Sequence, residues 1–76
     1  MWVRIRIGGS VKRLNYDAVI VYEDQDGRYA MTVENIIRQF KTDYEIKHGP
    51  MSDEMFIEEF FTIYWAWPYN KNELYI

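Results

Sequence analysis

The chain contains no cysteine among its 76 residues. Without cysteine, neither a disulfide framework nor a thiolate metal site can supply stability, so hydrophobic packing must supply it. The same absence fits a reducing compartment, and we expect a cytoplasmic protein. No secretory signal is expected, because apolar and basic side chains alternate over residues 2–6, where a signal would need a continuous apolar run.

Long apolar runs are also missing. The longest nearly uncharged stretch covers residues 60–70 and contains Pro68, whereas a membrane-spanning helix needs roughly 20 apolar residues. The sequence therefore predicts no membrane partner. A chain of 76 residues is long enough for one hydrophobic core, and we predict a single compact domain over residues 1–76.

Side chains that carry catalysis or bind metal ions are scarce. His48 is the one histidine, and its place before Gly49 and Pro50 favours helix capping over a catalytic or zinc-binding role. Residues 24–27 (Asp-Gln-Asp-Gly) lack the first and last ligands of an EF-hand loop and predict a hairpin turn. We therefore predict a protein that is not an enzyme and has no catalytic residues, metal site or cofactor.

The charges are unevenly distributed along the chain. Nine basic and twelve acidic residues give a net charge of −3. Residues 1–16 carry four basic and no acidic side chains, whereas residues 17–76 carry five basic and twelve acidic ones, a net charge of −7. An acidic surface repels phosphate backbones, which disfavours sequence-independent nucleic-acid binding unless the four basic groups cluster.

Four segments have the alternating or β-branched pattern of strands. They are residues 2–7, 11–14, 18–22 and 28–31. Glycine-containing turns at residues 8–10 and 24–27 separate the first pair and the last pair, as in two hairpins. The N-terminal half is thus predicted to be an antiparallel meander of three or four strands.

At Thr32 the apolar period changes from two residues to three and four, which predicts a helix with Thr32 as its N-cap. His48 and Gly49 end this helix, and Ser52 begins a second one. The apolar stripe of the first helix consists of Val33, Ile36, Ile37, Phe40 and Tyr44, and that of the second consists of Phe56, Ile57, Phe60, Phe61 and Tyr64. Residues 62–67 are equally rich in strand formers, so helix and strand both stay open there.

These elements predict an α+β fold, with a small antiparallel sheet of three or four strands followed by two helices packed on one face. We expect the helices to cover the apolar face of the sheet. That face is predicted to contain Val3, Ile5, Ile7, Val19, Val21 and Tyr29. Residues 73–76 are expected to form a short edge strand or a packed tail.

Aromatic residues are abundant, with fourteen Phe, Tyr and Trp side chains making 18% of the chain. This is more ring surface than a small core needs, so we expect part of it to be exposed. Trp65, Trp67 and Tyr69 surround Pro68 and form a rigid amphipathic cluster that suits an interface. The alternative is a C-terminal lid that closes the core.

The favoured hypothesis is a non-enzymatic inhibitor or adaptor that occupies a surface of a larger protein or nucleoprotein complex. The aromatic cluster would anchor it, and carboxylates of the second helix would face a groove built for phosphates. These carboxylates are Asp53, Glu54, Glu58 and Glu59. Small size, acidity and aromatic content are properties expected of phage or mobile-element inhibitors, including anti-CRISPR proteins, although no motif supports that analogy.

Two alternatives use other residues. The first is a small nucleic-acid-binding module in which the N-terminal hairpin gathers its basic groups beside a stacking aromatic ring. Its candidate residues are Trp2, Arg4, Arg6, Lys12 and Arg13. The same basic set could instead bind an acidic protein or keep the sheet soluble. The second alternative is a homodimer whose interface is the aromatic cluster or a sheet edge.

Overall fold

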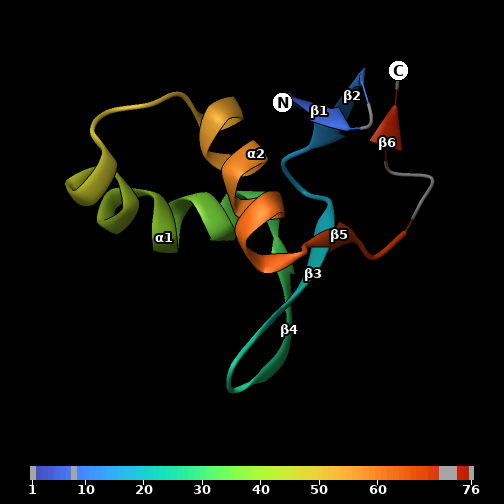
Figure 1. Cartoon of the computed structure of the whole chain (residues 1–76). Helices are drawn as coiled ribbons and strands as arrows, with labels where there is room; N and C mark the ends of the chain where they lie inside the picture. The colour runs from blue at the N-terminus through green and yellow to red at the C-terminus, as the bar shows by residue number, and fades with distance from the viewer. Residues whose placement is uncertain (1, 8, 71–73, 76) are drawn as a thin grey trace.

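The computed structural model describes residues 2–7, 9–70 and 74–75, which form an α+β fold (Figure 1). Four strands come first, followed by two helices and two short strands. The bounds are β1 Trp2–Ile7, β2 Ser10–Asn15, β3 Val19–Asp24, β4 Gly27–Thr32, α1 Val33–His48, α2 Asp53–Tyr64, β5 Trp67–Pro68 and β6 Leu74–Tyr75. The predicted fold class and the order of its first six elements are confirmed.

The strands divide into two antiparallel sheets, whereas the sequence suggested one meander. One sheet has the order β1-β2-β6, and the other has the order β4-β3-β5. β5 pairs with β3 and β6 with β2, so the segment after α2 adds an edge strand to each sheet. Residues 62–67 thus contain both the end of α2 and the start of β5. Met1, Gly8, residues 71–73 and Ile76, on which parts of the expected first turn and tail fall, lie outside the described residues.

The division has its cause in the link between β2 and β3. The N–H of Ala18 donates to the carbonyl of Asn15 at 3.0 Å, which turns the chain out of the first sheet. The carbonyls of Tyr16 and Ala18 then accept the N–H groups of Glu34 and Val33, each at 3.0 Å. Because the link is bonded to the first turn of α1, β2 and β3 diverge instead of pairing.

The buried face of β3 differs from the predicted one. Ile20 and Tyr22 are buried, and Val19 and Val21 are only half-buried. A shift of one residue in a strand exchanges its two faces, and β3 is apolar on both. The ring of Tyr22 stacks at 5.5 Å on that of Tyr29, its register partner in β4. Tyr29 therefore lies on the core-facing side as predicted, although it is partly exposed.

Both helices begin at the predicted caps. The side-chain oxygen of Thr32 accepts the N–H of Asn35 at 3.2 Å, and that of Ser52 accepts the N–H of Met55 at 3.1 Å. α2 packs against β1 and β3, which belong to different sheets, while α1 packs against α2 and β4 (Figure 1). Among the described residues, neither helix combines the length and apolar content that crossing a bilayer requires.

The core contains a cluster of aromatic rings centred on Phe60. Its ring lies 5.1 Å from that of Tyr22, 6.0 Å from Phe40, 6.1 Å from Phe56 and 4.7 Å from Tyr64. Edge-to-face and tilted pairs at these distances are favourable beyond the area that they bury. Much of the aromatic content is therefore structural, and the rest must be sought on the surface.

Candidate functional site

The segment after α2 exposes three large aromatic side chains in succession. Trp65 is 87% exposed, Trp67 46% and Tyr69 76%, while Ala66 and Pro68 between them are buried. The predicted exposure of the three rings is thus observed, while Ala66 and Pro68 pack on the core as the lid alternative expects. The two buried residues hold the segment on the core, so the exposed rings are attached to a fixed backbone.

Trp65 is also held in an unfavourable backbone conformation. It caps α2 with φ 53° and ψ 37°, and among the described residues it is the one non-glycine residue with positive φ. Helix C-caps in this left-handed region usually carry glycine, because a Cβ atom costs about 1 to 2 kcal/mol there. Strain and exposure of a large apolar ring coincide at one residue, a combination that marks functional positions.

Replacing Trp65 by glycine is therefore expected to raise the free energy of unfolding by about 1 kcal/mol. The exposed ring contributes little packing, so the relief of the backbone strain decides the sign. Urea unfolding followed by far-ultraviolet circular dichroism measures the change. Trp65→Ala is the matched control, since it removes the ring but keeps the Cβ atom, and it should not stabilise. A loss of stability in the glycine variant would contradict this account.

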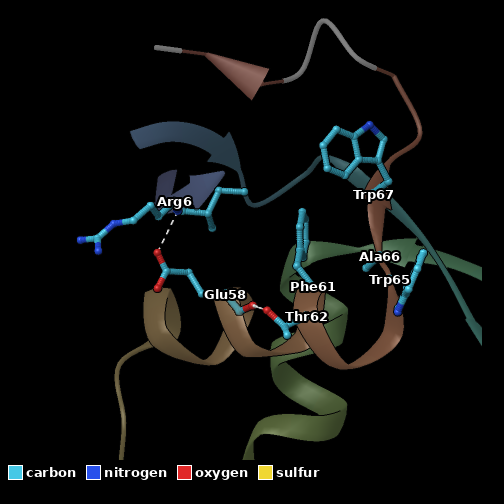
Figure 2. Close-up of a pocket in the computed structure, with 8 residues that line it drawn as sticks. Arg6, Glu58, Phe61, Thr62, Trp65, Ala66 and Trp67 are labelled. Carbon is cyan, nitrogen blue, oxygen red and sulfur yellow. Dashed lines mark hydrogen bonds between the residues drawn. The ribbon is translucent and has the colours of Figure 1, made fainter. Parts of the chain in front are cut away.

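A hollow of about 370 Å³ lies beside these rings, between β1 and β5. Its lining consists of Ile5, Arg6, Glu58, Phe61, Thr62, Trp65, Ala66 and Trp67. Figure 2 shows Phe61 rising from α2 between β1 and Trp67, with the charged ends of Arg6 and Glu58 at the opposite end of the hollow. Trp65 is turned away from Phe61 and Trp67 (Figure 2). The site is thus aromatic at one end and charged at the other.

The two strands that border the hollow each lack a free backbone N–H at one position beside it. The N–H of Arg6 points away from β2 and donates to Oε1 of Glu58 at 2.8 Å. On β5, the N–H of Tyr69 donates to the carbonyl of Val19 at 2.9 Å. The backbone nitrogen of the preceding residue, Pro68, therefore points to the outer edge of the strand, and it carries no hydrogen to donate there. A capped donor and an edge proline both prevent pairing with another strand. A ligand of this hollow must therefore be held mainly by side-chain contacts.

Asp53 joins three parts of the fold and is not a free surface charge. Its Oδ1 accepts a hydrogen bond from Nζ of Lys41 at 2.8 Å, and its Oδ2 accepts one from the Tyr16 hydroxyl at 2.7 Å. Both hydrogen bonds lower the pKa of Asp53, and the bond from Lys41 has the larger effect. The bond between Lys41 and Asp53 also raises the pKa of Lys41. Burial, followed by the bond to Asp53, raises the pKa of Tyr16 to about 12. Asp53 therefore stabilises the fold by linking α2 to α1 and to the segment between β2 and β3.

The other acidic candidates are also partly occupied. Glu58 caps the edge of β1, and a side-chain hydrogen bond to Glu59 raises the pKa of Tyr44, while Oε2 of Glu59 is buried without a partner among the described residues. Only Glu54 is exposed. The four carboxylates that were expected to face a partner's groove are therefore not all free on the surface of α2. The sequence could not reveal these contacts, because they connect α2 with distant parts of the chain.

The basic candidates do not form one group. Arg4 and Arg13 are register partners across β1 and β2 and share the outer face, where the Arg13 guanidinium lies 5.4 Å from the Trp2 ring centre. Lys12 is paired with the buried Ile5 and lies on the inner face, so the expected gathering of all basic groups on one face is wrong. Lys12 and Arg13 are consecutive residues of β2, so their side chains point to opposite faces in any register.

Arg4 and Arg6 also have acidic neighbours from α2. A second hollow, of about 350 Å³, adjoins the first and shares Ile5, Arg6 and Glu58 with it. Its remaining lining is Arg4, Val11, Glu54 and Met55. The basic strand and the acidic helix, which the sequence suggested as two separate sites, therefore face each other across one groove, and each weakens the field of the other.

The two places where the sequence was searched for a metal or catalytic site are the turn at residues 24–27 and His48. The turn at residues 24–27 is the predicted hairpin, in which Oδ1 of Asp24 accepts the N–H of Asp26 at 2.8 Å. His48 lies in the last turn of α1, with its ring centre 4.2 Å from that of Tyr44. Within the described part of the chain, no cluster of three or more His, Cys, Asp or Glu side chains could hold a metal ion.

The hollow itself was not predicted. Phe61 was assigned to the core stripe of the helix and Arg6 to a basic face, and nothing in the sequence indicated that they line one site. Arg6 and Glu58 are 52 positions apart, so their contact depends on how α2 crosses β1. Of this lining, the sequence indicated Trp65, Trp67 and Glu58 as members of one partner-binding set, and Arg6 as a member of a separate basic set.

Comparison with family models, curated proteins and solved structures gives no match to this chain. A fold by itself does not identify a function, so the function is inferred from the geometry of the site.

Proposed function

We propose that this protein acts without catalysis, as a protein-binding module that docks on a larger partner through the aromatic end of the hollow. The proposal rests on one observation: Trp65 has a strained left-handed backbone conformation, and its side chain is nevertheless 87% exposed. A ring that is 87% exposed contributes little packing to offset the strain of that conformation. Tryptophan and tyrosine on a fixed backbone are the side chains that most often dominate protein interfaces.

The inhibitor hypothesis fits this proposal with one change. A net charge of −3 favours encounter with a basic groove of the kind that holds nucleic acids. However, Asp53 and Glu58 are engaged within the fold, so acidity would act through the overall field and Glu54, while the aromatic rings make the contacts. We propose an inhibitor or adaptor of the phage or mobile-element type, comparable with anti-CRISPR proteins, as the specific form of this function.

Direct binding of nucleic acid through the N-terminal hairpin receives less support. The Trp2 ring is in contact with Arg13, Lys12 lies on the other face, and Arg4 and Arg6 line a groove with acidic residues. A phosphate chain along this strand would therefore meet carboxylates as well as guanidinium groups. Stacking on Trp2 would also compete with the cation–π contact.

Affinity capture from bacterial lysates with quantitative mass spectrometry tests the proposal. The unaltered protein should retain a defined protein or complex, and Trp65→Ala and Trp67→Ala should each reduce its recovery at least tenfold, the loss of one interface anchor. Ile46→Ala is the matched control, because Ile46 is also a large exposed apolar residue but lies on α1, outside the hollow. Equal recovery with all variants would refute docking through the aromatic segment.

A further inference from the structure

We propose that, before its partner is bound, this hollow is covered by a second copy of the chain in a two-fold symmetric dimer. The inference rests on the proposed function for the identity of the docking surface. It adds how that surface is protected: each copy shields the aromatic rings of the other, and the partner competes with self-association. Exposed tryptophans on a free monomer would otherwise favour unspecific association.

The shape of the site suits reciprocal contact. A projecting ring, Trp65, stands at the rim of a hollow that also contains Phe61 and Trp67. In an isologous interface the same patch is used twice, so a projection on one copy meets the recess on the other, and the reverse contact is made at the same time. The Trp65 ring of each copy then lies against Phe61 of the partner subunit.

The charged end of the hollow can pair with the charged end of a second copy, because it contains one basic and one acidic side chain. Arg6 comes from β1 on one side of the hollow, and Glu58 comes from α2 on the other side (Figure 2). A two-fold axis along the hollow places the β1 side of one copy opposite the α2 side of the other. Arg6 then faces Oε2 of Glu58 of the partner subunit, because Oε1 is bonded within its own chain, and the reverse pair forms by symmetry. The aromatic ends meet at the same time.

The blunted edges explain why the second copy is bound by side chains and not as an added strand. Glu58 holds the outward N–H of Arg6, and Pro68 has no N–H to offer. At these two positions beside the hollow, neither strand offers a free N–H for sheet continuation. A dimer at this site uses ring packing and two symmetry-related ion pairs.

Sedimentation and light scattering over a concentration series test the dimer. The unaltered chain should shift from 9.3 kDa toward twice that mass as its concentration rises to about 1 mM, which detects a dimer with a dissociation constant of about 1 mM or below. Arg6→Glu and Glu58→Lys, tested singly, should each weaken the dimer at least tenfold, because each places like charges opposite one another. An equimolar mixture of these two variants should recover the dimer, since both ion pairs are restored in the mixed species.

Only a reciprocal interface predicts recovery on mixing, because a folding defect in either variant would persist in the mixture. If Glu58→Lys does not fold, the unaltered chain and Trp65→Ala still decide the question, and the latter should dimerise at least tenfold more weakly. A chain that stays monomeric throughout, or two folded variants that do not recover on mixing, would overturn the dimer. Trp65-dependent capture of another protein by a strictly monomeric chain would refute self-association while supporting the docking function. A dimer without any such capture would do the reverse.

Discussion

Replacing Phe60 by alanine is expected to lower the free energy of unfolding by about 3 to 5 kcal/mol. Phe60 is 3% exposed and contacts aromatic rings from β3, α1 and its own helix. The substitution breaks four ring pairs. It also leaves a cavity between β3, α1 and α2, which the packed elements cannot fill by moving closer to one another. A chain of 76 residues has a total stability of about 4 to 11 kcal/mol, so the variant is expected to be near or below its limit of folding.

Phe61→Ala is the matched control for this prediction. It removes the same ring one position further along α2, where the side chain is half-buried beside the hollow. Its cost is expected to be about 1 kcal/mol, in keeping with the smaller area that it buries. Denaturant unfolding followed by circular dichroism compares the two variants. Equal losses would show that the ring cluster around Phe60 is not the centre of stability.

Asp53→Ala is expected to lower the free energy of unfolding by about 2 kcal/mol, because it removes two hydrogen bonds to a charged acceptor. It also leaves the Tyr16 hydroxyl and the Lys41 ammonium group without that acceptor. Asp53→Asn should cost about half as much, since an amide oxygen can still accept from Tyr16 but carries no charge for Lys41. Unfolding by urea at neutral pH measures both variants. A neutral effect of Asp53→Ala would contradict the structural task of this residue.

The same three side chains determine a pH dependence with opposite directions in acid and in alkali. The pKa of Asp53 is lowered below its ordinary 3.8, so its contribution is complete above pH 3.8 and is lost as the pH falls through the folded value. The pKa of Tyr16 is raised from 10.0 to about 12, so its contribution is complete below pH 10.0 and is lost between there and about pH 12. The raised pKa of Lys41 acts in the alkaline direction too.

Variants separate the two pH effects. The stability difference between the unaltered protein and Asp53→Asn should shrink below pH 3.8. The alkaline loss that begins near pH 10.0 should diminish in Tyr16→Phe, which has no phenol to ionise. Unfolding free energies measured in acid, at neutral pH and in alkali test both statements. Identical alkaline profiles with and without the Tyr16 hydroxyl would argue against the proposed coupling.

Local signals in the sequence predicted the helices better than the sheets. Thr32 and Ser52 cap their helices as expected, because capping depends on residues only three positions apart. The buried face of β3 could not be chosen from the sequence, since Val19 and Val21 are as apolar as Ile20. The choice is made by Phe60 and Phe40, which contact Tyr22 from the helices.

The site shows the same limit. The sequence indicated that Trp65 and Trp67 are exposed, because their positions lie beyond the apolar stripe of α2. It could not indicate that Glu58 binds the backbone of Arg6 or that Asp53 binds Lys41, since these contacts arise only when the helices are packed. Long-range hydrogen bonds of this kind turned an expected acidic face into structural support for a groove.

The position of β2 between β1 and β6 has a practical consequence. Trp2 pairs with Asn15 on one side of β2, and Tyr75 pairs with Arg13 on the other, so the two ends of the described chain lie roughly 10 Å apart, two strand spacings. The turn between β3 and β4 projects from the far side of the molecule (Figure 1). A short linker could therefore join these two ends, and a circular permutant could begin and end at residues 25–26 without breaking any β-ladder.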